Sequence, residues 1–93
     1  MFFHISIHRP KPGKEAVLIE SMHRFGEACM MQEGSRGANV IHDEERGILI
    51  GLAVWDSREE WEEAQPAMLK AVENDPFEEW EKEPPQVYHG EGV

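Results

Sequence analysis

Hydrophobic and polar residues alternate along the first eight positions of the chain. The apolar positions are Phe3, Ile5 and Ile7, and the polar positions are His4, Ser6 and His8. A period of two is typical of a β-strand with two unlike faces, because successive side chains point to opposite sides of a sheet. The pattern therefore predicts a strand over Phe2 to His8. It ends before Pro10 and Pro12, which lack an amide donor.

A broad apolar stripe at helical spacing occupies the next segment, from Lys14 to about Gln32. The residues that mark it recur at steps of four, three and four: Leu18, Met22, Phe25 and Cys29. Side chains at this spacing share one face of a helix, so we expect an amphipathic helix that packs on a flat surface. The segment from Gly34 to Gly37, which has a glycine at each end, ends the helix, and Ala38 to His42 returns to an extended pattern.

The segment from Ile48 to Trp55 contains only apolar residues and glycine. The polar turn at residues 43–47 joins it to the preceding strand, so the two strands are expected to form a hairpin. A strand with one face in water usually alternates, and both faces of this strand must therefore be covered. Helices account for one face, and in so short a chain a second copy is the simplest cover for the other. The sequence thus favours a homodimer.

A second helical region follows Ser57, which is placed to cap a helix with Glu60 three residues later. Because a proline in a helix interior costs about 3 kcal/mol, we expect a kink or a restart at Pro66. A further helical start is predicted at Asp75 to Glu78, and a last strand within Gln86 to Val93. The order strand, helix, strand, strand, helix, strand is the ferredoxin-like βαββαβ arrangement, an α+β fold with an antiparallel sheet.

Length and charge narrow the range of partners. At 93 residues the chain is one domain, residues 1–93. Its 19 acidic and 9 basic residues give a formal net charge of -10, so we expect no nucleic acid and no membrane as partner, since both are anionic. No apolar run approaches the roughly 20 residues of a membrane-spanning helix. The single cysteine and the lack of a leader-like start favour a cytoplasmic location.

Histidines and carboxylates give little sign of a metal site. His4 and His8 share a strand face but lie about 13 Å apart at 3.3 Å per residue, too far to bind one ion, and we expect no metal. The acidic runs at residues 58–63 and 78–83 are typical of solvated helix faces rather than of a general acid or base. Cys29 lies on the apolar stripe, where a free thiol packs as a small hydrophobe.

Sulfur-bearing and aromatic side chains offer material for a pocket. The residues concerned are Met22, Phe25, Met30, Met31, Trp55 and Trp61. Thioethers and rings adapt to flat aromatic ligands, which makes a small hydrophobic ligand one expectation. Packing in the core accounts for the same residues equally well, so both readings stay open.

Two segments resemble a known family. Lys11 to Glu15, after the first strand, and Val54 to Trp61, where the third strand meets the second helix, are similar to the antibiotic biosynthesis monooxygenase-like domains of the dimeric α/β-barrel superfamily. The resemblance covers nearly the whole chain. It implies two sheets packed face to face in a dimeric α/β barrel, with a pocket between each sheet and its helices. Some members oxygenate polycyclic phenols without metal or flavin, so it also implies that no cofactor is needed.

The function hypothesis is a cofactor-independent, monooxygenase-like protein, an oxidoreductase that acts on a small hydrophobic aromatic or quinone-like compound. The catalytic candidates, for proton transfer, are then His4, Ser6 and His8. The substrate-binding candidates are Met22, Phe25, Trp55 and Trp61. Alternation leaves open whether the histidine face points toward the helices or toward a second subunit, where these residues would be interface residues instead.

Two other hypotheses are open. A dimeric barrel of this kind could bind or sense a small ligand without catalysis, as a binding or regulatory module. Haem degradation is the third, and related haem-degrading proteins use an asparagine on strand one with a tryptophan and a histidine on helix two. The matching positions here hold Ser6 or Ile7, Ala64 and Asn74, so that triad is absent and this activity is disfavoured.

Overall fold

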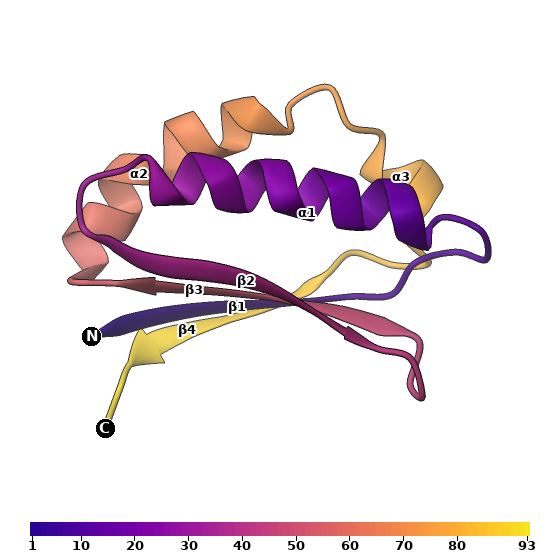
Figure 1. Cartoon of the computed structure of the whole chain (residues 1–93), viewed down its shortest axis with the longest axis horizontal. Coiled ribbons are helices and arrows are strands. Elements are labelled where there is room, and N and C mark those ends of the chain that lie inside the picture. Colours follow the sequence, from indigo (N-terminus) through magenta and orange to yellow (C-terminus); the bar gives the residue numbers. More distant parts are fainter.

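Four strands and three helices make up the chain, and the computed structural model describes all of it, Met1 to Val93. In chain order the elements are β1 (Phe2–His8), α1 (Glu15–Met30), β2 (Ser35–Asp43), β3 (Ile48–Trp55), α2 (Arg58–Ala71), α3 (Phe77–Trp80) and β4 (Gln86–Glu91). The strands form one antiparallel sheet in the order β2-β3-β1-β4. All three helices lie on one side of it (Figure 1). The predicted ferredoxin-like α+β arrangement is confirmed.

Local sequence signals set most of the element boundaries. Ser57 caps α2, because its side-chain oxygen accepts a hydrogen bond from the Glu60 amide at 3.3 Å. Gly47 closes the turn between β2 and β3 with a φ of 66°, a left-handed conformation that favours glycine. β2 begins at Ser35, earlier than the predicted start at Ala38, through a register shift in its pairing with β3.

Pro66 does not restart α2, which runs from Arg58 to Ala71 as one helix. Of the two alternatives expected at this proline, a kink or a restart, the restart is therefore wrong. The missing proline amide leaves the carbonyl of Glu62 without its helical donor. Both Glu62 and Pro66 are exposed, so water can replace that donor and the helix continues.

The register of the strands sorts the sheet residues onto two faces. Residues directly opposite one another share a face, and β1 pairs with β3 from Phe2 opposite Trp55 to His8 opposite Leu49. The face under the helices carries Phe2, His4, Ser6, His8, Leu49, Gly51, Ala53 and Trp55. The other face, which we call the open face because no helix covers it (Figure 1), carries Phe3, Ile5, Ile7, Ile41, Ile48, Ile50, Leu52, Val54 and Tyr88.

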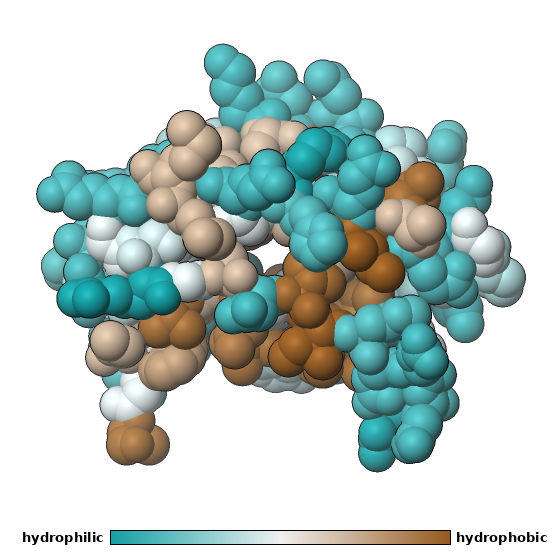
Figure 2. Space-filling view, in the orientation of Figure 1, coloured by the Kyte–Doolittle hydropathy of each residue, from teal (hydrophilic) through white to brown (hydrophobic).

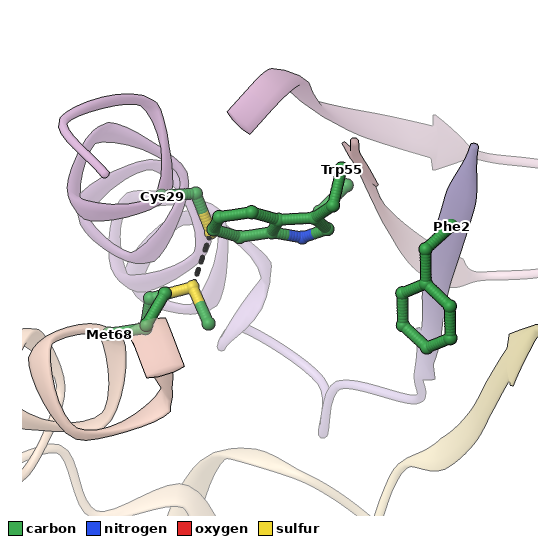
Figure 3. Packing of buried hydrophobic residues seen from close by; sticks show 6 residues of the cluster. Phe2, Cys29, Trp55 and Met68 are labelled. Carbon is green, nitrogen blue, oxygen red and sulfur yellow. Dashed lines mark hydrogen bonds between the residues drawn. The ribbon is translucent and has the colours of Figure 1, made fainter. Parts of the chain in front are cut away.

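The core between sheet and helices is divided into two clusters. The first contains Phe2, Cys29, Ala53, Trp55, Ala64 and Met68 (Figure 3). The second contains Leu18, Met22 and Leu49, with Phe77 and Trp80 packed against it. Phe77 and Trp80 meet edge to face, with 5.9 Å between ring centroids. These two rings anchor α3 to the second cluster.

The open face is apolar and only partly covered. Leu52 and Val54 are partly exposed in the single chain, whereas Ala53 and Trp55, their neighbours on the other face, are buried. Apolar surface that is left in water costs about 25 cal/mol per Å² relative to burial. β3 thus has two apolar faces, as its sequence requires, and the chain itself buries only one of them.

The two chain ends lie side by side (Figure 1). The Gly92 amide donates to the Met1 carbonyl at 2.8 Å, and the Met1 ammonium lies 3.7 Å from a carboxylate oxygen of Glu91. These contacts continue the pairing of β1 with β4 to the ends of both strands.

Candidate functional site

A cavity of about 600 Å³ lies between the sheet and the helices. β1, β2 and β3 line it on the sheet side together with Val87 of β4, and α1, α2 and Phe77 of α3 line it on the helix side. It borders both core clusters, through Cys29 of one and Met22 of the other. Figure 2 shows the molecule hollowed between the helix layer and the sheet, with apolar side chains on the sheet side of the opening. Its volume is typical of a small-molecule site, about 300–1,000 Å³.

The polar row of β1 faces this cavity. His4, Ser6 and His8 all line it, while Ile5 and Ile7 between them lie on the open face. The histidine face therefore points toward the helices, and the alternative of an interface with a second subunit is excluded for these three residues.

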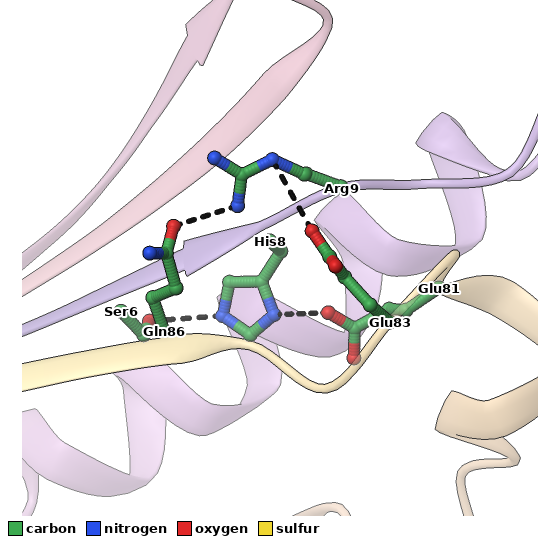
Figure 4. A network of polar contacts seen from close by, with 6 residues as sticks. All are labelled: Ser6, His8, Arg9, Glu81, Glu83 and Gln86. Carbon is green, nitrogen blue, oxygen red and sulfur yellow. Dashed lines mark hydrogen bonds and ion pairs between the residues drawn. The ribbon is translucent and has the colours of Figure 1, made fainter.

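His8 connects a serine hydroxyl to a buried carboxylate. Its Nδ1 lies 2.7 Å from Oε1 of Glu81, and its Nε2 lies 2.9 Å from Oγ of Ser6 (Figure 4). Because an ionised carboxylate can only accept, the tautomer that fits both contacts has its hydrogen on Nδ1, which donates to Glu81, and leaves Nε2 to accept from the Ser6 hydroxyl. The three groups thus form one relay that can take up a proton from the cavity.

Glu81 is held in place by the segment that follows α3. Its amide donates to the Phe77 carbonyl at 2.8 Å, and it forms an isolated antiparallel bridge with Pro10. The next amide, that of Lys82, donates to the Arg9 carbonyl at 2.8 Å. The chain after α3 is therefore fastened directly to the chain after β1, and the carboxylate is aimed at His8 by backbone contacts on both sides.

Sequence reasoning missed Glu81, because it treats residues 78–83 as a solvated acidic face. That interpretation is wrong for this residue, whose side chain is 4% exposed, while the side chain of Glu83 is 59% exposed. Glu81 lies just beyond the last residue of α3, where the chain turns back toward β1. The one signal that could have singled it out is its position directly after the anchoring Trp80.

Gly51 lies opposite Ser6 in the sheet. A Cβ atom at this position would stand 2.7 Å from Oγ of Ser6 and 3.3 Å from Cε of Met22. The missing side chain therefore makes room for the serine hydroxyl, and any larger residue at position 51 would push that hydroxyl or the methionine aside.

The other polar end of the β1 row is an aromatic stack. The His4 ring lies 5.3 Å from the Trp61 ring and 6.4 Å from the His89 ring, measured between centroids. Burial lowers the pKa of His4 below its ordinary value, and the nearby His89 lowers it further. His4 is therefore neutral at physiological pH, and can offer both a donor and an acceptor nitrogen to the cavity.

The structure divides the four predicted substrate-binding residues into two pairs. Met22 and Phe25 line the cavity, on α1. Trp55 does not line it, because it is fully buried in the first core cluster beside Phe2 (Figure 3). Trp61 does not line it either, since its ring packs against Phe2 and His4 from the α2 side. Neither tryptophan therefore contributes to the cavity wall, contrary to the expectation that both bind the substrate.

Cys29 is fully buried, as predicted, and its thiol lies at the cavity wall. Burial raises its pKa to about 11. The thiol therefore stays protonated at neutral pH, and its Sγ lies 2.9 Å from Sδ of Met68 (Figure 3). This environment favours packing over nucleophilic chemistry, which needs the thiolate.

No three His, Cys, Asp or Glu side chains are grouped so that they could hold a metal ion. None of the helices combines the length and the apolar character needed to cross a bilayer.

Known structures share this fold. Over 99% of this chain and 94% of the other, it superposes on the structure of Rv0793 from Mycobacterium tuberculosis with a TM-score of 0.84 at 17% identity. A protein from Deinococcus radiodurans, provisionally named an antibiotic biosynthesis monooxygenase, matches over 100% of this chain and 93% of its own with a TM-score of 0.83 at 14% identity. Another structure, named as an antibiotic biosynthesis monooxygenase, gives a TM-score of 0.80 at 12% identity over 100% and 99% of the two chains.

The likeness lies in structure rather than in sequence. No protein-family model matches the sequence, and no curated protein matches it significantly. The chain thus has the fold of the antibiotic biosynthesis monooxygenase-like proteins, as its sequence resemblance implies. At these identities the comparison defines the fold alone.

Proposed function

We propose that the protein is a cofactor-independent, monooxygenase-like enzyme that acts on a small hydrophobic aromatic or quinone-like compound. The observation that carries the proposal is the position of the Ser6–His8–Glu81 relay, which ends in an apolar cavity of about 600 Å³. The names of several structural neighbours point to the same chemistry.

The relay suits the first step of such a reaction, the removal of a proton from the substrate. A phenolic or enolic O–H in the cavity donates to Oγ of Ser6 while the serine hydrogen passes to Nε2 of His8. Glu81 then stabilises the imidazolium through Nδ1. The apolar side chains of the cavity give the resulting anion a less polar environment than bulk water, which raises its reactivity toward an electrophile.

Dioxygen is the oxidant in this proposal. The electron-rich anion gives electrons to dioxygen, one oxygen atom enters the substrate, and the other leaves as water. For a substrate of the anthrone type, a CH₂ group becomes a carbonyl group, so that the two hydrogens lost from carbon appear in the water formed. The protein contributes orientation, deprotonation and desolvation.

The same proposal includes a homodimer. The open face presents a continuous apolar surface that includes Ile5, Ile50 and Leu52, and a second copy would cover it sheet to sheet, at about 10 Å between the sheets. Sedimentation at micromolar concentration should give twice the mass of the 10.7 kDa chain. A stable single chain would contradict this part of the proposal.

Oxygen consumption tests the enzymatic part. With an anthrone-type phenol, the wild type should consume dioxygen, and His8→Gln should lower the rate by about 100-fold because the base is lost. His42→Gln, a change at an exposed histidine outside the cavity lining, is the matched control and should leave the rate unchanged. Binding of the phenol, seen as tryptophan quenching, without any oxygen consumption would contradict catalysis. It would favour a non-catalytic binding module.

A further inference from the structure

We propose that Ser6 is also a nucleophile, and that Ser6, His8 and Glu81 together catalyse acyl transfer from small apolar carboxylic esters. The inference rests on which nitrogen of the His8 ring contacts the carboxylate and which contacts the hydroxyl. The carboxylate binds Nδ1 of the imidazole at 2.7 Å and the hydroxyl binds Nε2 at 2.9 Å, which is the assignment of nitrogens found in serine hydrolases. This activity does not depend on the oxygenation proposed above, because it needs no oxidant.

The contact between His8 and Glu81 is shielded from bulk water, which makes it stronger in catalysis. The side chain of Glu81 is 4% exposed and that of His8 is 13% exposed. In such surroundings a charge-assisted hydrogen bond is stronger than at the surface, and the imidazolium formed during attack gains more from the carboxylate. Glu81 acts through His8 and does not touch the substrate, so it is a positioning residue.

The serine hydroxyl has the access that a nucleophile needs. Ser6 lines the cavity, and Gly51 opposite it has no side chain to block the hydroxyl. Met22 and Phe25 on α1 form the apolar wall facing the sheet, where an acyl chain or an aromatic acyl group would lie. The cavity volume of about 600 Å³ limits the substrate to a small ester.

His4 is the group placed to stabilise the charge that develops on the ester carbonyl oxygen. It precedes Ser6 by two residues on the same face of β1, about 6.6 Å along the strand, and it also lines the cavity. A neutral imidazole with a free N–H is a suitable donor to an oxyanion. The row His4, Ser6, His8 thus supplies donor, nucleophile and base in sequence order.

The reaction is balanced without any redox step. The Ser6 oxygen forms a bond to the ester carbonyl carbon as its proton passes to Nε2 of His8. The bond from that carbon to the alkoxy oxygen then breaks, and the alcohol leaves with the proton. Water repeats the sequence on the acyl-serine, which releases the carboxylic acid and restores the hydroxyl.

Covalent labelling of the full-length protein is the direct test. We expect an alkyl fluorophosphonate to give one adduct per chain, located on Ser6 by mass spectrometry of the digested protein. Ser6→Ala should abolish the adduct. Ser35→Ala is the matched control, since the Ser35 hydroxyl is buried and has no hydrogen-bond partner, and it should label like the wild type. A folded wild type, judged by circular dichroism, that gives no adduct on Ser6 would overturn the proposal.

Hydrolysis of p-nitrophenyl butyrate tests the roles of the other groups. His8→Gln should lower the rate by about 100-fold or more. Glu81→Gln should lower it by about 10-fold or more and alter its pH profile, with partial recovery in Glu81→Asp, while the exposed control Glu83→Gln changes neither. A rate that Glu81→Gln leaves unaltered in magnitude and pH profile would contradict the positioning role. Ester cleavage without oxygen consumption would sustain this inference and refute the oxygenase. Oxygen consumption without ester cleavage would refute this inference and sustain the oxygenase.

Discussion

The two faces of the sheet use the same strands for opposite purposes. On β1 the helix-facing side chains are His4, Ser6 and His8, and the cavity lies above them, whereas Phe3, Ile5 and Ile7 point to the open face. On β3 both sets are apolar, but only the helix-facing set is buried within the chain. One face therefore combines core residues with the candidate site, and the other is mainly apolar, with the polar residues Asn39, Asp43 and Gln86 on its two edge strands. A strand with period-two patterning can serve a site and an interface at once.

The largest difference between the faces should appear at two neighbouring residues of β3. Trp55→Ala removes a fully buried ring from the first core cluster and should lower the free energy of unfolding by about 3–5 kcal/mol. Val54→Ala, one residue earlier on the open face, should cost about 1 kcal/mol in dilute solution. Urea unfolding of both variants measures this, and equal losses would contradict the assignment of the faces.

A charge on the open face should disrupt the proposed dimer. Leu52→Asp places a carboxylate in the middle of that face, and it should weaken the proposed dimer by about 100-fold, equivalent to about 2.8 kcal/mol, because an unpaired charge would be buried. Val17→Asp on α1, at a residue 37% exposed, is the control and should leave the mass in sedimentation unchanged. Should Leu52→Asp sediment like the wild type, the second copy must bind elsewhere.

The helix-facing side should be sensitive to added volume at its single glycine. Gly51→Ala brings a methyl group to 2.7 Å from the Ser6 hydroxyl, and we expect a loss of about 1–3 kcal/mol from overpacking together with slower labelling of Ser6. Gly90→Ala on β4 is a matched strand control, since nothing lies within 4 Å of the added atom. Thermal unfolding compares the two. A Gly51→Ala protein as stable as Gly90→Ala would show that the contact is easily relieved.

The smallest effect concerns the pH dependence of stability at His4. Because burial lowers its pKa in the folded chain below the ordinary value of 6.5, the unfolded chain binds a proton more readily. The stability linked to this group is therefore present above pH 6.5 and is lost as the pH falls through the folded pKa. Denaturant unfolding between pH 5 and 8 should show a shallower decline for His4→Phe than for the wild type. Identical slopes would mean that His4 protonates freely in the folded state.

The fold was open to prediction because local rules agree with the tertiary structure. Alternation in β1, the apolar run of β3 and the Ser57 cap each lead to the observed element. The direction of the polar row on β1 was not open to prediction, since alternation is the same whichever face meets the helices. Only packing against α1 decides it.

The site was predictable only in part, for a related reason. Ser6 and His8 are close in sequence, but Glu81 reaches them across 73 positions of the chain, and its burial depends on the contacts of the segment after α3 with β1. Trp61 was misplaced because helical spacing identifies an inward-facing residue without saying whether it meets a cavity or another ring. Long-range contacts of this kind leave no periodic trace in a single sequence.

The closeness of the chain ends has a practical consequence for engineering. Because the Gly92 amide already reaches the Met1 carbonyl at 2.8 Å, a short flexible linker could join them, and new ends could be opened in the exposed turn around Glu45. The permuted chain would begin with β3 and end with β2, with β4 leading directly into β1 as a hairpin. Spatial neighbourhood, rather than order along the polypeptide, is what such a circular permutant would preserve.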